Sequence, residues 1–442
     1  MPIHYTGAAA AVPYKCNLTI AGTWANNDTV TVTIDSHDLV IDIGTTAITT
    51  ADIADKVYRA FNAGTFDDNL EDDEVRNTGG GQIPQFGGLE ASFSGSVVSF
   101  WGPAGVPYAL TFSKSSTSGT VAASTVQSAT GPSFWDNVEN WSTGALPVNG
   151  DTIWLDHRCG GRSVSHGLPN GSLQPAAVHM TQGFTGILGL PAVNNYTGRP
   201  YPEYRARYAV FDDQSEATTP TYYIGEKDGA GTGPRLVNIE QEDIKSKWVI
   251  HNTGTAISGE RAAVNIELAA TIDNSVAITR GTIAIAERPA DNTQLEILFV
   301  QGGASCFLGA AVPFASGATI NINGGELYSL ATITESITLR DATSHLLGGA
   351  SNVLEVYGGI CYYSVSALVQ PTDINQSGVI NFEGCTTQCG MANADPWVCF
   401  AGAVIWDRTG VATPYPVITC PNGIETVTFH LGGGAKVQPA GT

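Results

Sequence analysis

Four carboxylates in the C-terminal half are the side chains best suited to chemistry: Glu326, Asp341, Glu355 and Glu383. Enzymes that hydrolyse glycosidic bonds use two carboxyl groups, about 5 Å apart in retaining enzymes and about 6.5–9.5 Å apart in inverting ones. Strands stacked at about 4.8 Å would place carboxylates one or two layers apart at similar separations. The sequence spacing of these four residues does not place them on neighbouring layers. An acidic chain is also expected to carry carboxylates that face the solvent. The sequence therefore predicts no catalytic residue, with a glycan-cleaving enzyme as the alternative.

Residue spacing gives little support to metal or cofactor chemistry. Cys385 and Cys389 form a CxxxC pair, but no second pair follows at zinc-site spacing. The acidic run Asp67–Glu74 lacks the alternating ligands and central glycine of an EF-hand loop, so we expect a solvated loop. The sequence contains no P-loop, dinucleotide fingerprint or nucleophile elbow. We predict no metal-binding residue, no cofactor-binding residue and no cofactor.

The overall charge of the chain argues against polyanionic binding partners. The 442 residues include 41 acidic and 20 basic side chains, which gives a formal net charge of -21. Such a surface repels polyanions, so we expect no nucleic-acid partner and no binding to anionic membranes. No stretch approaches the roughly 18 uninterrupted apolar residues of a membrane-spanning helix.

Short β-rich runs that end in glycine recur after residue 235. They are Leu298–Gly303, Ile320–Gly325, Leu346–Gly349, Val353–Gly359 and Val379–Gly384. The spacing from Gly303 to Gly325 is 22 residues, and the other spacings between such glycines are similar. Spacings of this length, with period-2 strands and almost no helix, predict a right-handed parallel β-helix over residues 235–442. A β-sandwich is the alternative.

Residues 1–130 have the pattern of a small α+β unit. Alternating β-branched and polar residues predict strands at Asn17–Ile20, Thr29–Ile34, Leu39–Ile43, Leu89–Phe93, Val97–Trp101 and Tyr108–Phe112. Between them, Ile53, Val57, Ala60 and Phe61 share one face of a helix that Thr50 can cap. The small polar residues of Thr120–Ser133 indicate a linker or a final edge strand. We therefore expect a mainly β protein: this α+β unit followed by the β-helix.

Residues 131–234 are expected to form a junction and the first coils of the β-helix. Trp135 and Trp141 lie six residues apart, ahead of a turn at Pro147–Asp151. Paired tryptophans in a turn-rich segment are more often core anchors than an exposed sugar platform, so we expect them to be buried.

Three arginines of the same region, Arg199, Arg205 and Arg207, lie among several tyrosines. Arginine beside tyrosine suits a surface that docks another protein. An irregular loop held by its own aromatic side chains explains the segment equally well.

The segment Gly131–Trp154, GPSFWDNVENWSTGALPVNGDTIW, carries the most specific motif of the chain. It resembles the WDNAANWSTGAVPVNGDTV motif of a poorly characterised family encoded in tailed bacteriophages and in bacterial, notably planctomycete, genomes. Further matches are Phe184–Gly186, Gly189–Pro191, Tyr201–Arg205, and Gly358–Gly359 with Cys361–Tyr363. The stretch Thr386–Pro416 and the cysteine-rich end depart from the pattern. The family has no established activity, so the resemblance implies no catalytic residues.

The resemblance implies a bacteriophage virion structural protein without enzymatic activity, assembled in the host cytoplasm. The α+β unit would attach to the particle, and the β-helix would project as a capsid decoration or as a spike or fibre component. Expected partners are other virion proteins and further copies of the chain, with a trimer and a host surface glycan as options. The alternatives are a glycan-binding or glycan-cleaving tail spike and a bacterial surface adhesin.

Overall fold

A computed structural model shows that the chain is mainly β, with long parallel sheets. It describes residues 1–34, 37–45, 48–62, 75–77, 89–191, 207–212, 219–227, 231–242, 245–268, 274–285, 295–309, 312, 314–330, 336–341, 344–348, 351–356, 359–362, 369–374, 378–381, 397–399, 404–407, 418–420 and 427–431. Within these ranges, no helix is both long and apolar enough to cross a membrane.

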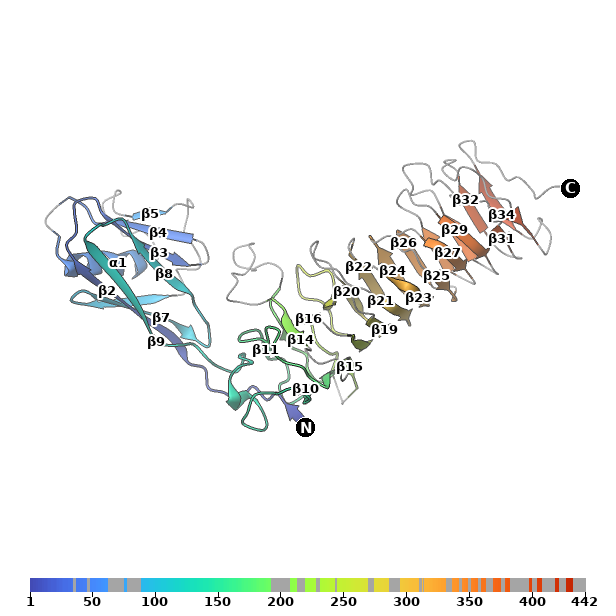
Figure 1. Cartoon of the computed structure of the whole chain (residues 1–442), viewed down its shortest axis with the longest axis horizontal. Coiled ribbons are helices and arrows are strands. Elements are labelled where there is room, and N and C mark those ends of the chain that lie inside the picture. Colours follow the sequence, from blue (N-terminus) through green and yellow to red (C-terminus); the bar gives the residue numbers. More distant parts are fainter. Residues whose placement is uncertain are drawn as a thin grey trace.

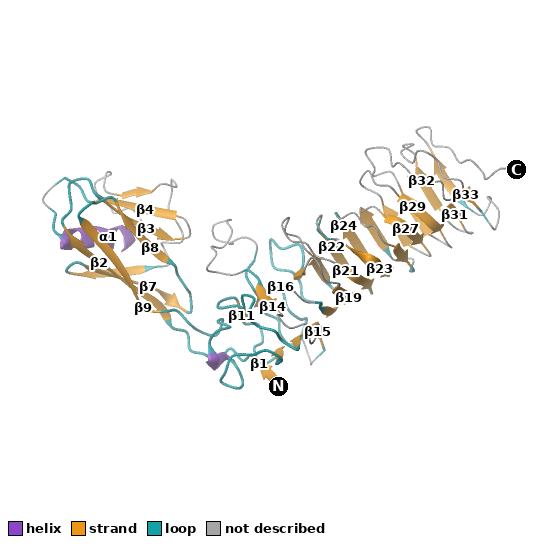
Figure 2. Ribbon diagram, in the orientation of Figure 1, coloured by secondary structure: helices purple, strands orange, loops and turns teal. Residues whose placement is uncertain are grey.

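The N-terminal unit contains two four-stranded antiparallel sheets and the helix α1 (Thr50–Asn62) (Figure 2). One sheet has the order β6 (Glu90–Ser94), β7 (Val97–Ala104), β2 (Pro13–Gly22), β9 (Gly119–Gln127). The other has the order β5 (Val75–Asn77), β4 (His37–Asp42), β3 (Thr29–Ile34), β8 (Leu110–Lys114). The predicted strands and helix occur at or near their expected positions. β9 lies at the edge of its sheet. Of the two interpretations of Thr120–Ser133, the final edge strand is therefore the one that the structure supports.

The helix α1 begins with a reciprocal pair of side-chain bonds. The Thr49 hydroxyl accepts a hydrogen bond from the Asp52 N–H at 3.2 Å, and the Asp52 carboxylate accepts one from the Thr49 N–H at 2.9 Å. This pattern is a capping box, and its bonds to the carboxylate lower the pKa of Asp52. The capping residue is therefore Thr49, and the prediction of Thr50 was wrong by one position. Ile53 and Val57 are fully buried, as predicted for the apolar face.

The first strand of the chain does not belong to the N-terminal unit. β1 (Pro2–His4) pairs in parallel with β10 (Thr152–Leu155), so that Ile3 lies opposite Ile153. The α+β unit is therefore an insertion between two neighbouring strands of one sheet. The unit expected to begin at residue 1 begins after this strand.

Two long parallel sheets form the rest of the structure. The first long sheet has the order β1, β10, β12 (Ala177–Thr181), β15 (Thr221–Glu226), β17 (Lys247–His251), β19 (Asn274–Arg280), β21 (Leu295–Gln301), β23 (Phe314–Asn323), β25 (Ser336–Leu339), β27 (Ser351–Val356), β29 (Val369–Ile374), β31 (Trp397–Cys399), β33 (Ile418–Thr419). The second long sheet has the order β11 (Ser163–Val164), β13 (Ile187–Leu188), β16 (Leu236–Glu242), β18 (Val264–Leu268), β20 (Thr282–Ile285), β22 (Ser305–Leu308), β24 (Glu326–Ser329), β26 (His345–Gly348), β28 (Gly359–Tyr362), β30 (Gly378–Asn381), β32 (Val404–Asp407), β34 (Thr428–Leu431). β14 (Ala209–Asp212) pairs with β16 beside this order.

The chain alternates between the two long sheets, and each return adds a strand beside the previous one (Figure 1). Neighbouring strands of both sheets are parallel, as in the pairs β15 with β17 and β22 with β24. This arrangement is compatible with a β-helix or another solenoid. It contradicts the alternative of a β-sandwich, whose sheets are antiparallel.

The length of the repeat varies along the stack. Val300 pairs with Ile322, 22 residues further on, whereas Ser336 pairs with Val353 after only 17 residues. The spacing from Gly325 to Gly349 does not measure a repeat, because these residues follow strands of different sheets, β23 and β26. The predicted spacing was therefore right for two strands of the same sheet. It was wrong where one strand belongs to the first long sheet and the other to the second.

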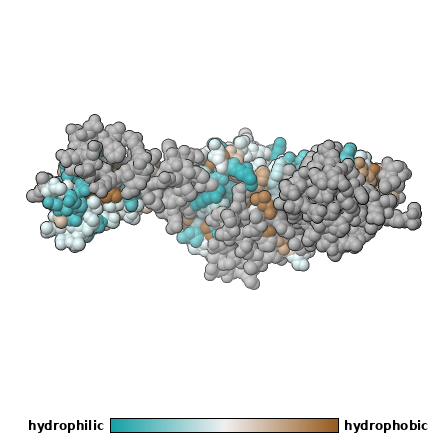
Figure 3. Space-filling model, turned by 90° about the horizontal axis from the view of Figure 1, so that it is seen from above, coloured by the Kyte–Doolittle hydropathy of each residue, from teal (hydrophilic) through white to brown (hydrophobic). Residues whose placement is uncertain are grey.

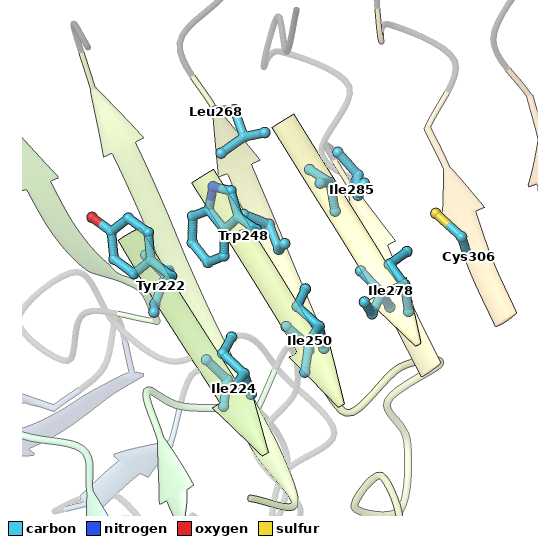
Figure 4. Close-up of a cluster of buried hydrophobic side chains, with 14 of the residues drawn as sticks. Tyr222, Ile224, Trp248, Ile250, Leu268, Ile278, Ile285 and Cys306 are labelled. Carbon is cyan, nitrogen blue, oxygen red and sulfur yellow. The ribbon is translucent and has the colours of Figure 1, made fainter. Parts of the chain in front are cut away.

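Buried side chains at equivalent positions of successive strands form rows that run across the long sheets (Figure 4). In the first long sheet, Ile224 lies opposite Ile250 and Ile250 opposite Ile278. Trp248 stacks on Tyr222 with ring centroids 4.0 Å apart and an interplanar angle of 10°. Because each strand alternates inward and outward side chains, every new strand extends these rows by one residue.

Candidate functional site

Glu326 is a predicted carboxylate that lies in a defined polar cluster. It begins β24, between Ser305 of β22 and His345 of β26 in register. Its carboxylate accepts hydrogen bonds from the Ser305 hydroxyl and the Tyr328 phenol, both at 3.0 Å, and lies 3.7 Å from His345 Nδ1. The side chains of Glu326 and His345 are 37% and 36% exposed. The neighbouring Leu327 is buried, so this cluster lies on the outer face of the second long sheet.

An aromatic pair lies beside this carboxylate. The rings of Phe307 and Tyr328 stack with centroids 4.8 Å apart, and the Arg261 guanidinium lies 5.1 Å from the Phe307 ring centre. Partial burial raises the pKa of Tyr328, and the hydrogen bond to Glu326 and the negative charge of Glu326 raise it further. This cluster can therefore offer a hydrogen-bonded carboxylate and an arginine to a polar ligand.

We predict that Glu326→Gln lowers the pKa of Tyr328 towards its ordinary value, because an amide carries no charge to oppose the phenolate. Since the pKa of Tyr328 is raised in the folded protein, its protonated form stabilises the fold below about pH 10, the unfolded value. That contribution is lost as the pH rises through the higher folded value. An NMR titration of ¹³C-labelled tyrosine, assigned with Tyr328→Phe, measures the shift. An unchanged pKa in Glu326→Gln would contradict the assignment of its cause.

Two of the other predicted carboxylates lie in or next to the first long sheet, whereas Glu326 lies in the second. Asp341 follows β25 of the first long sheet, where its N–H donates to the Ser344 hydroxyl at 3.2 Å. Glu355 lies in β27, also in the first long sheet, and Glu383 lies outside the described residues. Glu326 and Glu355 therefore occupy different sheets and form no row of stacked carboxylates. In the described part of the chain, no group of three or more His, Cys, Asp or Glu side chains could hold a metal ion.

Trp135 and Trp141 are buried, with 4% and 3% of their surfaces exposed, which confirms their prediction as core anchors. Their rings meet edge to face at 4.7 Å, and Trp141 meets Tyr5 in the same way at 5.0 Å. The Trp141 indole N–H donates to the Trp135 carbonyl at 2.8 Å. The buried rings of Trp135 and Trp141 therefore offer no exposed platform for a sugar.

Asn140 connects the two segments that lead into and out of the N-terminal unit. It is fully buried. Its side-chain amide donates to the carbonyls of Gly131 and Phe134, at 2.8 and 2.7 Å, and its side-chain oxygen accepts from the Ala9 N–H at 2.9 Å. Its backbone carbonyl accepts from the Thr6 N–H at 2.7 Å. The function of this motif in the structure is therefore to fasten the outgoing and returning chain to the first strands of the long sheet.

Four rings stack on the outer face of the first long sheet, in the order His4, Trp154, His179, Tyr223. The centroid distances are 5.8, 3.9 and 4.6 Å, and the planes of Trp154 and His179 differ by only 4°. His4 Nδ1 lies 2.9 Å from Asp156 and His179 Nδ1 lies 2.7 Å from Glu226, so both histidines are hydrogen-bonded. Because Trp154 and His179 each have a ring on both faces, these two inner rings offer their edges to solvent. Sequence inspection missed it, since only the pairing of the strands aligns these four positions.

Several remaining predictions concern arginines and cysteines. The Arg207 guanidinium pairs with Glu260 at 3.2 Å and lies 5.2 Å from the ring centre of Tyr208, which is buried. These contacts of Arg207 favour the interpretation of a loop held by its own aromatic side chains over that of a surface that docks another protein. Arg199, Arg205, Cys385, Cys389 and the acidic run Asp67–Glu74 lie outside the described residues.

Comparison with protein-family models, with curated proteins and with solved structures finds no match to this chain. The resemblance of Gly131–Trp154 to a phage-encoded family therefore stays a prediction from its motif.

Proposed function

We propose that this chain is a non-enzymatic structural protein of a bacteriophage virion, whose two long sheets form a right-handed parallel β-helix that projects from the particle. The observation that carries the proposal is one cluster of buried side chains, whose described members lie along both sheets from Ile3 to Leu346 and also include Val427. In such a stack each repeat contacts only its neighbours, so stability is distributed along an axis. An extended, evenly stabilised body suits a strut or a spike, and the resemblance of the tryptophan motif supplies the virion as its setting.

The N-terminal unit is the part we assign to attachment. It has its own hydrophobic cluster, which includes Leu18, Val32 and Ile53 and is separate from that of the long sheets. The buried contacts of Asn140 and Trp141 join it to the first coil. A unit with its own core can bind a neighbouring virion protein without disturbing the stack.

The acidic character of the chain agrees with an exterior role in the proposed particle. On the face seen in Figure 3, the described surface is a mixture of hydrophilic and hydrophobic residues. Because the whole chain has a net charge of -21, it is expected to repel nucleic acid and other acidic particles.

The test is the copy number of this chain in purified particles, measured by quantitative mass spectrometry against the major capsid protein. A ratio that matches the symmetry of the capsid lattice would support a capsid decoration, and a few copies per particle would support a tail spike or fibre. Absence of the chain from intact particles that contain the other virion proteins would overturn the proposal.

The cluster around Glu326 favours one second candidate, a spike that cleaves a surface glycan, because it presents a hydrogen-bonded carboxylate on an outer face. That function requires the purified chain to release reducing ends from bacterial surface polysaccharide. The release must be lost in Glu326→Gln and retained in Asp341→Asn, whose exposed carboxylate lies beside the other sheet. Equal activity in both variants would exclude Glu326 as the acid.

A further inference from the structure

A hollow on the N-terminal unit combines an aromatic ring with polar side chains. It lies on the sheet β6-β7-β2-β9 and is lined by Lys15, Asn17, Ser99, Phe100, Trp101 and Val126. Residues that alternate with these, such as Leu18 and Val98, are fully buried in the cluster that packs against α1. The polar lining residues therefore face away from the helix, on the outer side of the sheet.

Trp101 is held in one orientation by its neighbours on the sheet. It pairs with Glu90 on one side and with Lys15 on the other. Its indole N–H donates to the Glu90 carboxylate at 2.9 Å, and its side chain is partly exposed. Among the described residues no ring stacks on Trp101, in contrast to Trp154, which lies between two other rings. A hydrogen-bonded indole on which no described ring stacks can receive a flat apolar surface at little cost in side-chain entropy.

Hydrogen-bonding groups lie directly beside this ring. Asn17 and Ser99 face each other in register, and the Ser99 hydroxyl donates to the Asn17 side-chain oxygen at 2.8 Å. That bond fixes the amide and leaves its NH₂ group to donate. Lys15 is exposed and adds a cationic donor, while Val126 is 59% exposed and adds an apolar wall. The hollow therefore offers one aromatic face and several fixed or flexible donors.

We propose that this hollow is a carbohydrate-binding site for a gluco-configured pyranose ring. Such a ring carries its C–H groups on flat faces and its hydroxyls around the rim. One face would pack on Trp101, and the rim hydroxyls would accept from Asn17 and Lys15. An apolar surface with a few placed polar groups is the usual composition of a small-molecule site. The inference goes beyond the structural role proposed above and does not depend on it, since the chain could bind glycan whether or not it belongs to a virion.

The test titrates the full-length protein with cellohexaose and with chitohexaose, and follows binding by calorimetry and by NMR of the indole N–H groups. We expect binding that shifts the Trp101 indole resonance, assigned with Trp101→Phe. Trp101→Ala should weaken binding by about tenfold or more, and Asn17→Ala by about threefold or more, as expected for loss of an aromatic contact and of one hydrogen bond. Trp154→Phe, which changes another partly exposed tryptophan on a different sheet, should leave the affinity unchanged.

Three results would overturn the proposal. The first is no binding of either hexasaccharide at about 10 mM, a concentration that would reveal even a millimolar site. The second is unchanged affinity in a Trp101→Ala protein whose circular dichroism matches the wild type. The third is binding that shifts other indole resonances and not that of Trp101, a readout on the wild-type protein that holds even where a variant fails to fold. Particle copy number is measured independently, so either proposal can fail alone.

Discussion

Asn140→Ala is expected to loosen the connection between the N-terminal unit and the first strands of the long sheets. The substitution leaves the buried Ala9 N–H without its partner, and it removes one of the hydrogen bonds to each of the carbonyls of Gly131 and Phe134. A buried group left unpaired costs about 1–3 kcal/mol and each further lost bond about 0.5–1.5 kcal/mol, so we expect a loss of about 2–5 kcal/mol in local stability. Hydrogen exchange at the amides of Thr6 and Ala9 should accelerate accordingly, and proteases should cleave near residues 6–12 and 128–133.

Asn137→Ala is the matched control for this prediction. Asn137 belongs to the same motif, but it is partly exposed and caps a single short 3₁₀ turn at Val138–Asn140 through the Glu139 N–H. Loss of such a cap costs about 1 kcal/mol. If both variants exchanged and were cleaved alike, the role assigned to Asn140 would be refuted.

Trp248→Ala should produce the second large effect, in the interior of the long sheets. Trp248 is 1% exposed, stacks on Tyr222, and donates its indole N–H to the Ser246 hydroxyl at 2.7 Å. Removal of a buried aromatic side chain costs about 3–5 kcal/mol. Because each repeat contacts only its neighbours, the destabilisation should be concentrated in β15, β17 and β19. Hydrogen exchange resolved by strand measures this distribution.

Val249→Ala tests the same strand on its other face. Val249 follows Trp248 directly and is 42% exposed, so its truncation should change stability by no more than about 0.5 kcal/mol. If Trp248→Ala destabilised all strands equally, the idea that each repeat is stabilised only by its neighbours would be contradicted. Comparable losses in the two variants would contradict the inward and outward assignment of β17.

The candidate sites show where sequence reasoning succeeds and where it stops. Glu326 could be named from its residue type, but its contacts with Ser305 and His345 depend on strands 19 to 21 residues away that lie beside it. Trp101 is one of eight tryptophans, and nothing in the sequence marks it as a residue that lines a hollow. Its place beside Glu90 and Lys15 arises only when three strands pair.

The sequence by itself determined the mainly β character, the position of the helix α1 and the burial of Trp135 and Trp141, because alternation, capping and apolar spacing are local properties of the chain. The tertiary structure alone decided which glycine-ended runs share a sheet, that β1 lies beside β10 across an inserted unit, and that four rings from distant segments stack in a ladder. Period-2 alternation assigns a side chain to the inner or outer face of a strand but does not name the neighbouring strand. Parallel pairing joins residues far apart in the chain, and it is settled by the packing of all repeats together.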